Sequence, residues 1–221
     1  MARRVVVTGT GTGIGKTHLA EALLRRLARD GMERVAGIKP VESGVGEGVS
    51  DAARLAASST FHVKHEGIAL RAPISPHLAA RLEGIHLDPV AIAGTIAEAA
   101  TAVDLLLVEL PGGLFTPLAE SALNADLAAR LAPAYVLLVA PDRLGVLHEC
   151  LSTLRAAVAQ GLAVSGVALV APETADPSTG TNAGELARYT PVPVLPTVAR
   201  GAVDALAASH ALGVIAAAVR G

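Results

Sequence analysis

The sequence VVVTGTGTGIGKTHLAEALL, from Val5 to Leu24, decides the fold. A β-branched run ends at Thr8, a glycine-rich loop follows, and an Ala- and Leu-rich stretch then places its apolar residues at helical spacing. The N–H groups of such a loop can converge on an anion, and the start of the next helix also favours negative charge. We therefore expect a phosphate-binding loop, with Lys16 at the phosphates and the Thr17 hydroxyl at Mg²⁺.

The spacing of this loop departs by one residue from the strict phosphate-loop pattern. Counting back from Gly15 places Thr10 where the pattern requires its first glycine, so Gly9 stands one position early. The dinucleotide fingerprint G-x-G-x-x-G fails as well, because Ile14 replaces its third glycine. A plain strand-to-helix turn is the third alternative. The phosphate loop is preferred because all of its chemical groups are present at the first strand–helix junction.

Composition limits the class of protein. The chain has 221 residues and a formal net charge of −2, and 52% of its residues are hydrophobic but only 2% are aromatic. This length suits one domain, so we expect a single phosphate-loop domain over residues 1–221. The charge gives no reason to expect binding to nucleic acid or to a membrane. The single cysteine excludes an intrachain disulfide, and with no signal peptide apparent we expect a cytoplasmic protein.

Short β-branched runs alternate with Ala- and Leu-rich stretches along the chain. This alternation predicts an α/β fold with a doubly wound, mostly parallel sheet of the phosphate-loop NTPase type. The expected strands are Arg4–Thr8, Val35–Ile38, Leu105–Glu109, Tyr135–Ala140, Gly166–Val170 and Val192–Leu195. The expected helices are Lys16–Arg29, Asp51–Ala57, Pro89–Ala102, Leu144–Gln160 and Asp204–Arg220. The segment Ser58–Gly84 gives no regular pattern.

A second lysine stands where the ligand edge of the sheet is expected. Lys39 follows the second strand within GIKPVESG, from Gly37 to Gly44, and the carboxyl ends of parallel strands form the ligand crevice. There Lys39 could neutralise the charge of a transferring group or hold an anionic substrate, with Ser43 as a hydrogen-bond donor. The alternative is a solvated loop lysine.

Two acidic residues complete a possible magnesium site. Asp51 begins an expected helix, and Glu109 ends an expected strand just before Gly112 and Gly113. Together with Thr17 and nucleotide phosphates they supply the oxygen ligands that Mg²⁺ prefers. The alternatives are a helix cap for Asp51 and a solvated strand end for Glu109. The residues alone therefore predict Mg-ATP-dependent phosphoryl transfer.

Taken together, these motifs resemble those of the dethiobiotin synthetase family. The matching stretches follow in order: VTGTGTGIGKT, KPVESG, SDA, SPH at Ser75–His77, Glu109–Gly113 and Leu144–Gly145. The displaced glycine is this family's own spacing. The resemblance implies a homodimeric ligase of biotin biosynthesis that closes a ureido ring. In that reaction 7,8-diaminopelargonate and CO₂ form a carbamate, ATP phosphorylates it, and the second amine then expels phosphate to give dethiobiotin.

The resemblance also assigns roles to individual residues. The catalytic residues would be Lys16 and Lys39, which offset charge on the phosphoryl group and carbamate, with Thr12 and Ser43 bonded to the carbamate. The nucleotide would contact Gly13, Ile14, Gly15, Lys16, Thr17, His18, Asp51, Glu109, Gly112, Pro196, Thr197 and Val198. Mg²⁺ would bind Thr17, Asp51 and Glu109. The substrate would contact Ser43, and its carboxylate would rest on Gly145, Val146, Leu147 and His148 of the neighbouring subunit.

Two stretches depart from the family pattern. Leu110 and Pro111 stand where the family often has Gly-Ala, and Pro111 has no N–H to offer a ligand. Pro172 stands where the family often has an asparagine that reads adenine. We therefore expect weak selectivity, with CTP or GTP able to replace ATP.

Three other classes compete with this interpretation. Cobyrinate-type amidation ligases share the loop, but they usually carry a glutaminase domain for which this chain has no room. Partitioning ATPases normally have an additional lysine early in the loop, and none stands between Gly9 and Gly15. A nucleotide-binding module without turnover is the third alternative, and only an assay of phosphate release distinguishes it from an enzyme.

Overall fold

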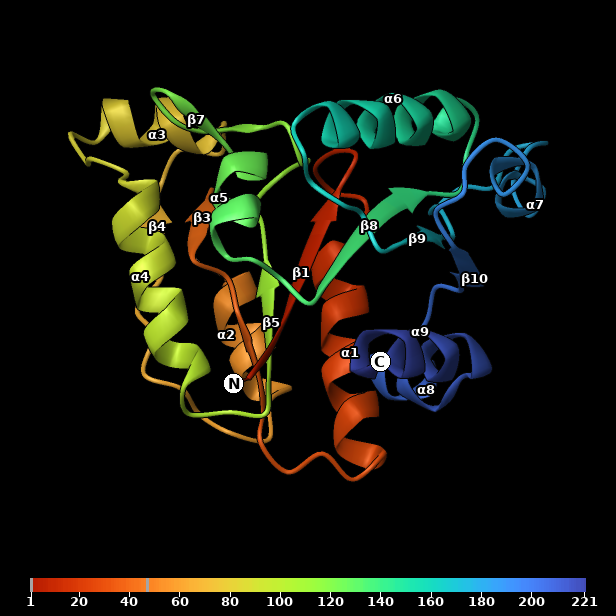
Figure 1. The fold of residues 1–221 in the computed structure, drawn as a ribbon, viewed down its shortest axis with the longest axis horizontal. Helices are drawn as coiled ribbons and strands as arrows, with labels where there is room; N and C mark the ends of the chain where they lie inside the picture. Colours follow the sequence, from red (N-terminus) through yellow and green to blue (C-terminus); the bar gives the residue numbers. More distant parts are fainter. Residues whose placement is uncertain (1, 47) are drawn as a thin grey trace.

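A six-stranded parallel sheet forms the centre of the computed structural model, which describes residues 2–46 and 48–221 (Figure 1). Its strand order is β10-β9-β8-β1-β5-β2, and every neighbouring pair is parallel. The strands are β1 (Arg3–Gly9), β2 (Val35–Ile38), β5 (Leu105–Glu109), β8 (Tyr135–Pro141), β9 (Gly166–Val170) and β10 (Val194–Val198). The predicted doubly wound α/β fold is confirmed.

Helices cover both faces of the sheet, and this explains why its central strands consist mostly of buried apolar residues. In β1, Val5 and Val7 belong to one hydrophobic cluster and Val6 to the other, because successive side chains of a strand point to opposite faces. The first cluster includes residues of α1 (Lys16–Arg29), α2 (Asp51–Ala57), α8 (Val203–Ala208) and α9 (His210–Arg220). The second includes residues of α3 (Pro76–Leu82), α4 (Pro89–Ala100), α5 (Asn124–Arg130), α6 (Val146–Ala159) and α7 (Asn182–Leu186).

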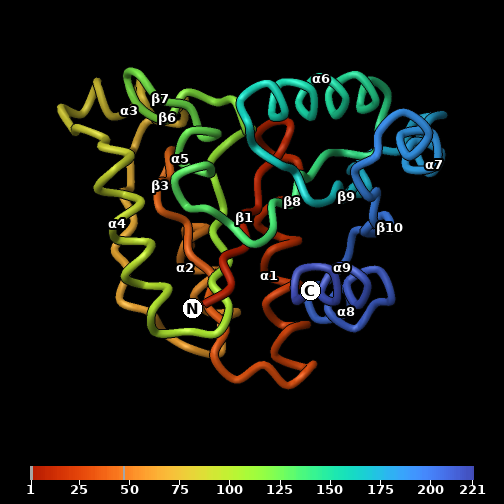
Figure 2. Tube along the Cα trace, viewed as in Figure 1, coloured from red at the N-terminus to blue at the C-terminus, as the bar shows by residue number. Residues whose placement is uncertain are grey.

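The glycine-rich loop and the chain ends lie at opposite ends of the sheet. Figure 2 shows both termini at one end, while α6 passes over the loop that follows β1 at the other. Arg3 Nε donates to the carbonyl of Val219, which ties the start of β1 to the end of α9. The loop therefore lies at the carboxyl edge of the parallel strands, where ligands bind in open α/β sheets.

Two small sheets stand beside the main one. In the first, β3 (Val41–Ser43) pairs in parallel with β4 (Ile68–Leu70). In the second, β6 (Pro117–Ala119) pairs antiparallel with β7 (Ala122–Leu123). These four strands were not predicted from the sequence, because two or three residues are too few to show an alternating pattern.

Three predicted elements depart most from the observed bounds, while β1, β8 and α4 differ from their expected ranges by one or two residues. The expected helix Asp204–Arg220 is two helices, because the extended backbone of Ser209 ends α8 and its side chain caps α9. Helix α6 begins at Val146 rather than Leu144, because Gly145 adopts a left-handed conformation with φ 96°. Strand β10 lies later than the expected Val192–Leu195. The single domain over residues 1–221 stays a prediction.

None of the helices among the described residues is both long and apolar enough to cross a bilayer.

Candidate active site

The glycine-rich loop leads directly into α1 without a capping side chain. Gly15 is the N-cap of α1 with φ 92°, and no side chain of the described residues makes a capping hydrogen bond there. A Cβ at Gly15 would lie 3.1 Å from Val170 and would also be strained by the backbone conformation. The first N–H groups of a helix have no partner within it. This end of α1 can therefore receive an anion.

The side chain of Lys16, the first residue of α1, folds back onto the glycine-rich loop. Its side chain is buried, and its Nζ donates to the carbonyl oxygen of Gly11 at 2.7 Å. Burial lowers the pKa of Lys16 to about 8, against the opposing charge of Glu109. A phosphate oxygen would be a stronger acceptor than this carbonyl, because charge-assisted hydrogen bonds are the stronger kind.

Lys39 joins two carboxylates from different elements. Its Nζ lies 2.5 Å from Asp51 Oδ2, at the start of α2, and 2.9 Å from Glu109 Oε1, at the end of β5. Burial works to lower the pKa of Lys39, but the charges and hydrogen bonds of Glu109 and Asp51 outweigh it and raise this pKa. The predicted convergence of these side chains at the edge of the sheet is therefore present.

The residues expected at Mg²⁺ lie together. Thr17 Oγ1 donates to Glu109 Oε1 at 2.8 Å, and Asp51 reaches the same cluster through Lys39. Glu109 Oε2 is buried without a hydrogen-bond partner among the described residues, which suits an oxygen that receives a cation. In the described part of the chain, no group of three or more His, Cys, Asp or Glu side chains could hold a metal alone. The remaining ligands would be phosphate and water oxygens, as is usual for Mg²⁺.

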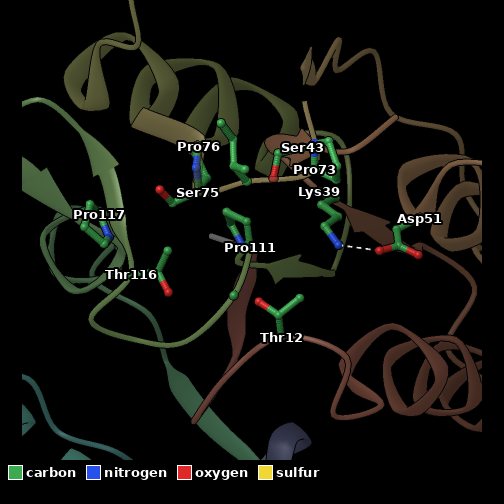
Figure 3. Close-up of a pocket in the computed structure, with 12 residues that line it drawn as sticks. Thr12, Lys39, Ser43, Asp51, Pro73, Ser75, Pro76, Pro111, Thr116 and Pro117 are labelled. Carbon is green, nitrogen blue, oxygen red and sulfur yellow. Dashed lines mark hydrogen bonds and ion pairs between the residues drawn. The ribbon is translucent and has the colours of Figure 1, made fainter. Parts of the chain in front are cut away.

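Two cavities meet at this cluster. The larger, of about 600 Å³, is lined by Ser43, Ser75 and Thr116 among others. The smaller, of about 270 Å³, lies along the loop from Thr12 to His18. The residues that line both are Thr12, Lys39, Asp51 and Gly112. Figure 3 shows Lys39 directed toward Asp51, with Thr12 and Ser43 around the larger cavity. One cavity can therefore hold a phosphate donor and the other an acceptor, with Lys39 between them.

The turn after β5 is held by a residue that was not predicted from the sequence. Asn124, at the start of α5, is buried and donates to the carbonyls of Pro111 and Gly113, the latter at 2.8 Å. A Cβ at Gly113 would lie 3.1 Å from the carbonyl oxygens of Gly9 and Thr10, so any larger residue would have to displace this turn slightly from the loop. An asparagine in an unpredicted helix gives no signal in the sequence.

A third cavity lies on the other side of the loop. It has a volume of about 270 Å³, and Arg143, Pro172 and Arg200 contribute to its lining together with Gly13 and Ile14. Neither arginine was predicted from the sequence, where the only signal is that each follows an expected strand. His18 Nε2 lies 2.7 Å from the carbonyl oxygen of Gly201, which ties α1 to the segment that carries Arg200.

Two groups of expected binding residues lie apart from this cluster. Pro196, Thr197 and Val198 form the end of β10, outside the linings of these three cavities, and the Val198 carbonyl already accepts the N–H of Ala171 at 2.9 Å. The start of α6, from Gly145 to His148, also lies outside these linings. Their expected roles stay predictions.

The parallel sheet, the glycine-rich loop and the lysine–carboxylate cluster define a phosphate-loop NTPase fold. The profile of the AAA domain family matches residues 3–202. Among solved structures, the MinC:MinD cell division protein complex of Aquifex aeolicus is similar with a TM-score of 0.62 and 13% identity, covering 99% of this chain and 95% of that one. Signal recognition particle 54 kDa protein of Aeropyrum pernix K1, in complex with GDP, has a TM-score of 0.57 and 15% identity, covering 99% of this chain and 49% of that one. At these identities the likeness shows the fold alone.

Sequence relatives identify the family within this class. A protein of Anaeromyxobacter dehalogenans (strain 2CP-1 / ATCC BAA-258), named ATP-dependent dethiobiotin synthetase BioD, is 40% identical over 203 residues, with 88% of this chain and 90% of the relative covered. A relative of the same name from Bradyrhizobium sp. (strain BTAi1 / ATCC BAA-1182) is 37% identical over 212 residues, with coverages of 94% and 96%. The chain belongs to the dethiobiotin synthetase family, and the resemblance inferred from its motifs is confirmed.

Proposed function

We propose that this chain catalyses the Mg-ATP-dependent conversion of 7,8-diaminopelargonate and CO₂ into dethiobiotin, ADP and phosphate. The observation that carries the proposal is the position of Lys39. Its ammonium group contacts both carboxylates of the expected metal site and lines the donor and acceptor cavities at once. Membership of the dethiobiotin synthetase family supports the same reaction.

On the donor side, the chain would bind and orient the triphosphate. The open N–H groups at the start of α1 would bind phosphate oxygens, and Lys16 Nζ would leave Gly11 for the β- and γ-phosphates. Thr17, Asp51 and Glu109 would hold Mg²⁺, which supplies positive charge to the phosphates when bound. The protein therefore contributes mainly position and electrostatic stabilisation.

On the acceptor side, Thr12 and Ser43 would donate hydrogen bonds to the carbamate in the larger cavity. A carbamate oxygen attacks the γ-phosphorus, so that a new P–O bond forms, the β–γ bridge breaks and ADP leaves. The second amine then attacks the carbonyl carbon, loses a proton and expels phosphate. Lys16 and Lys39 would stabilise the negative charge that develops in the first step. Holding both reactants at one point makes the transfer effectively intramolecular.

ATP is the co-substrate in the names that the relatives carry, and we propose that CTP and GTP also serve. The cavity beside the loop offers the Pro172 ring as a packing surface, flanked by Arg143 and Arg200. A proline cannot read the edge of a base. We place the base in this cavity.

A homodimer and a cytoplasmic location are further parts of the proposal. Leu144, just before α6, is 79% exposed and stands beside the expected binding element. In a dimer this surface would be covered, and the N–H groups at the start of α6 would receive the carboxylate of the partner's substrate.

One assay separates this function from its rivals. The protein is incubated with diaminopelargonate, bicarbonate and Mg-ATP, and phosphate release is measured with and without the diamine. Release that depends on the diamine supports the synthetase. Release independent of the diamine would support an ATPase switch, and binding without release would support a nucleotide-binding module. Dethiobiotin detected by mass spectrometry identifies the product.

A further inference from the structure

The extra residue of the glycine-rich loop makes a contact of its own. Thr10 occupies the position where the strict phosphate-loop spacing requires a glycine. Its N–H donates to the carbonyl of Val139 in β8 at 3.1 Å, and its Oγ1 donates to Glu149 Oε2 in α6 at 3.1 Å. The loop is therefore attached at this residue to a sheet strand and to a helix.

Glu149 connects this contact to the start of α6. It lies in the first turn of that helix, where a carboxylate interacts favourably with the helix dipole. Its other oxygen, Oε1, lies 3.4 Å from a guanidinium nitrogen of Arg143. Arg143 in turn lines the cavity beside the loop. A negative charge here would repel a substrate carboxylate bound at the same helix start, and Arg143 offsets that charge.

We propose that Thr10 and Glu149 form a strut that couples the nucleotide site to the substrate-carboxylate site at the start of α6. The inference rests on the proposed function, which places that carboxylate there. Glu149 is a positioning residue in this scheme, because it reaches the nucleotide site only through other residues, namely Thr10 and Arg143.

The coupling arises because the nucleotide and the substrate carboxylate each bind to a segment that the strut holds in place. Nucleotide phosphates fix the loop, and a fixed loop holds the Glu149 carboxylate and the first turn of α6 in one arrangement. A substrate carboxylate that needs the same arrangement then loses less conformational entropy on binding. Linkage makes the effect reciprocal, so the diamine tightens nucleotide binding by the same factor. A hydrogen bond that only stabilised the fold would change the unfolding midpoint and leave this factor unchanged.

Equilibrium binding measures the coupling directly. Calorimetric titration of the full-length protein with a non-hydrolysable ATP analogue and Mg²⁺ gives its Kd with and without saturating diaminopelargonate. We expect the diamine to lower this Kd by about fivefold or more in the unmodified chain. Thr10→Val removes the donor at nearly constant volume, and Glu149→Ala removes the acceptor. In either variant we expect the ratio of the two Kd values to fall below about twofold, and the double variant to show no further loss, because both changes break one contact.

Two matched variants serve as controls. Thr10→Ser keeps the hydroxyl and should keep the coupling, and so should Arg155→Ala, which alters an exposed residue later in α6. A ratio near one in the unmodified chain, or an undiminished ratio in Thr10→Val or Glu149→Ala, would overturn the strut. Diamine-dependent phosphate release from the same preparation distinguishes that result from failure of the proposed function, which would abolish this release.

Discussion

Lys39 is the residue on which the proposed chemistry most depends. Lys39→Gln keeps a similar length but removes the cation from the point where the two cavities meet. Loss of one group that stabilises developing charge costs about 100- to 1000-fold in kcat, and we expect that range in diamine-dependent phosphate release. Lys64→Gln, an exposed substitution of the same kind, is the matched control. If Lys39→Gln kept the kcat of the unmodified protein, Lys39 would not stabilise the developing charge.

For Cys150 we predict that the thiol is chemically unreactive in the folded protein. Its side chain is fully buried in α6, and burial, aided by the charge of Glu149, raises the pKa of its thiol to about 12. At pH 8 the folded protein should react with iodoacetamide orders of magnitude more slowly than the protein in guanidinium chloride. Because the unfolded thiol ionises at a lower pH than the folded one, the free energy of unfolding falls as pH rises through the unfolded pKa toward 12. Equal alkylation rates would contradict this burial.

Pro172 leads to a prediction about nucleotide choice. With no base-reading side chain there, we expect kcat/KM for CTP or GTP within about tenfold of that for ATP, or about 1.4 kcal/mol. Pro172→Asn adds an amide that can donate and accept, and should shift the preference toward ATP. Initial rates with each triphosphate measure both effects. A larger preference for ATP over every other triphosphate in the unmodified chain would refute the expectation.

Residues with a recognisable motif were predictable, and residues whose role depends on the fold were not. Lys16, Thr17 and Glu109 carry signals of spacing or strand position, and the structure brings them together. Asn124 carries no such signal, because it lies in an unpredicted helix and its partners are distant in the sequence, and Arg143 carries only its position after an expected strand.

At the scale of the element, strands with an apolar run and clear turns on both sides were predicted best. The bounds of β2, β5 and β9 match the expected ranges. The four strands of the small sheets were missed, since each is too short for its pattern to differ from a loop. The C-terminal helix pair was read as one helix because apolar spacing continues across Ser209, and a serine within a helix is not unusual.

Ser209 now supports a prediction for that helix pair. Its side chain accepts the N–H of Leu212 at the start of α9, with 3.3 Å between the donor and acceptor atoms. Ser209→Ala should lower the free energy of unfolding by about 1 kcal/mol, because one N-terminal donor loses its acceptor. Urea titration followed by circular dichroism measures the change. Ser209→Asp keeps an acceptor and should restore most of the loss. An unchanged midpoint for Ser209→Ala would show that the cap contributes nothing.

At the scale of the whole molecule, the sheet topology places the site. Strand β1 lies between β5 and β8, so the later strands of the chain extend to one side of it and β5 and β2 to the other. Open α/β sheets bind ligands where the strand order diverges in this way, beyond the carboxyl ends. The alternation of strands and helices predicted this architecture. It could not predict the lateral wall built by β3, β4 and α3, because β4 and α3 come from the segment without a regular pattern and β3 has only three residues.

The shared wall of the donor and acceptor cavities has a consequence for inhibitor design. A single molecule that joins a triphosphate mimic to a diamine-like chain would occupy both cavities at once. The two cavities adjoin, since Thr12 and Gly112 line each of them. Tethering turns the second contact into an intramolecular one, so its two halves would together bind far more tightly than either fragment by itself. Compounds of that design would also fill the acceptor cavity, which lies outside the cavity proposed for the triphosphate.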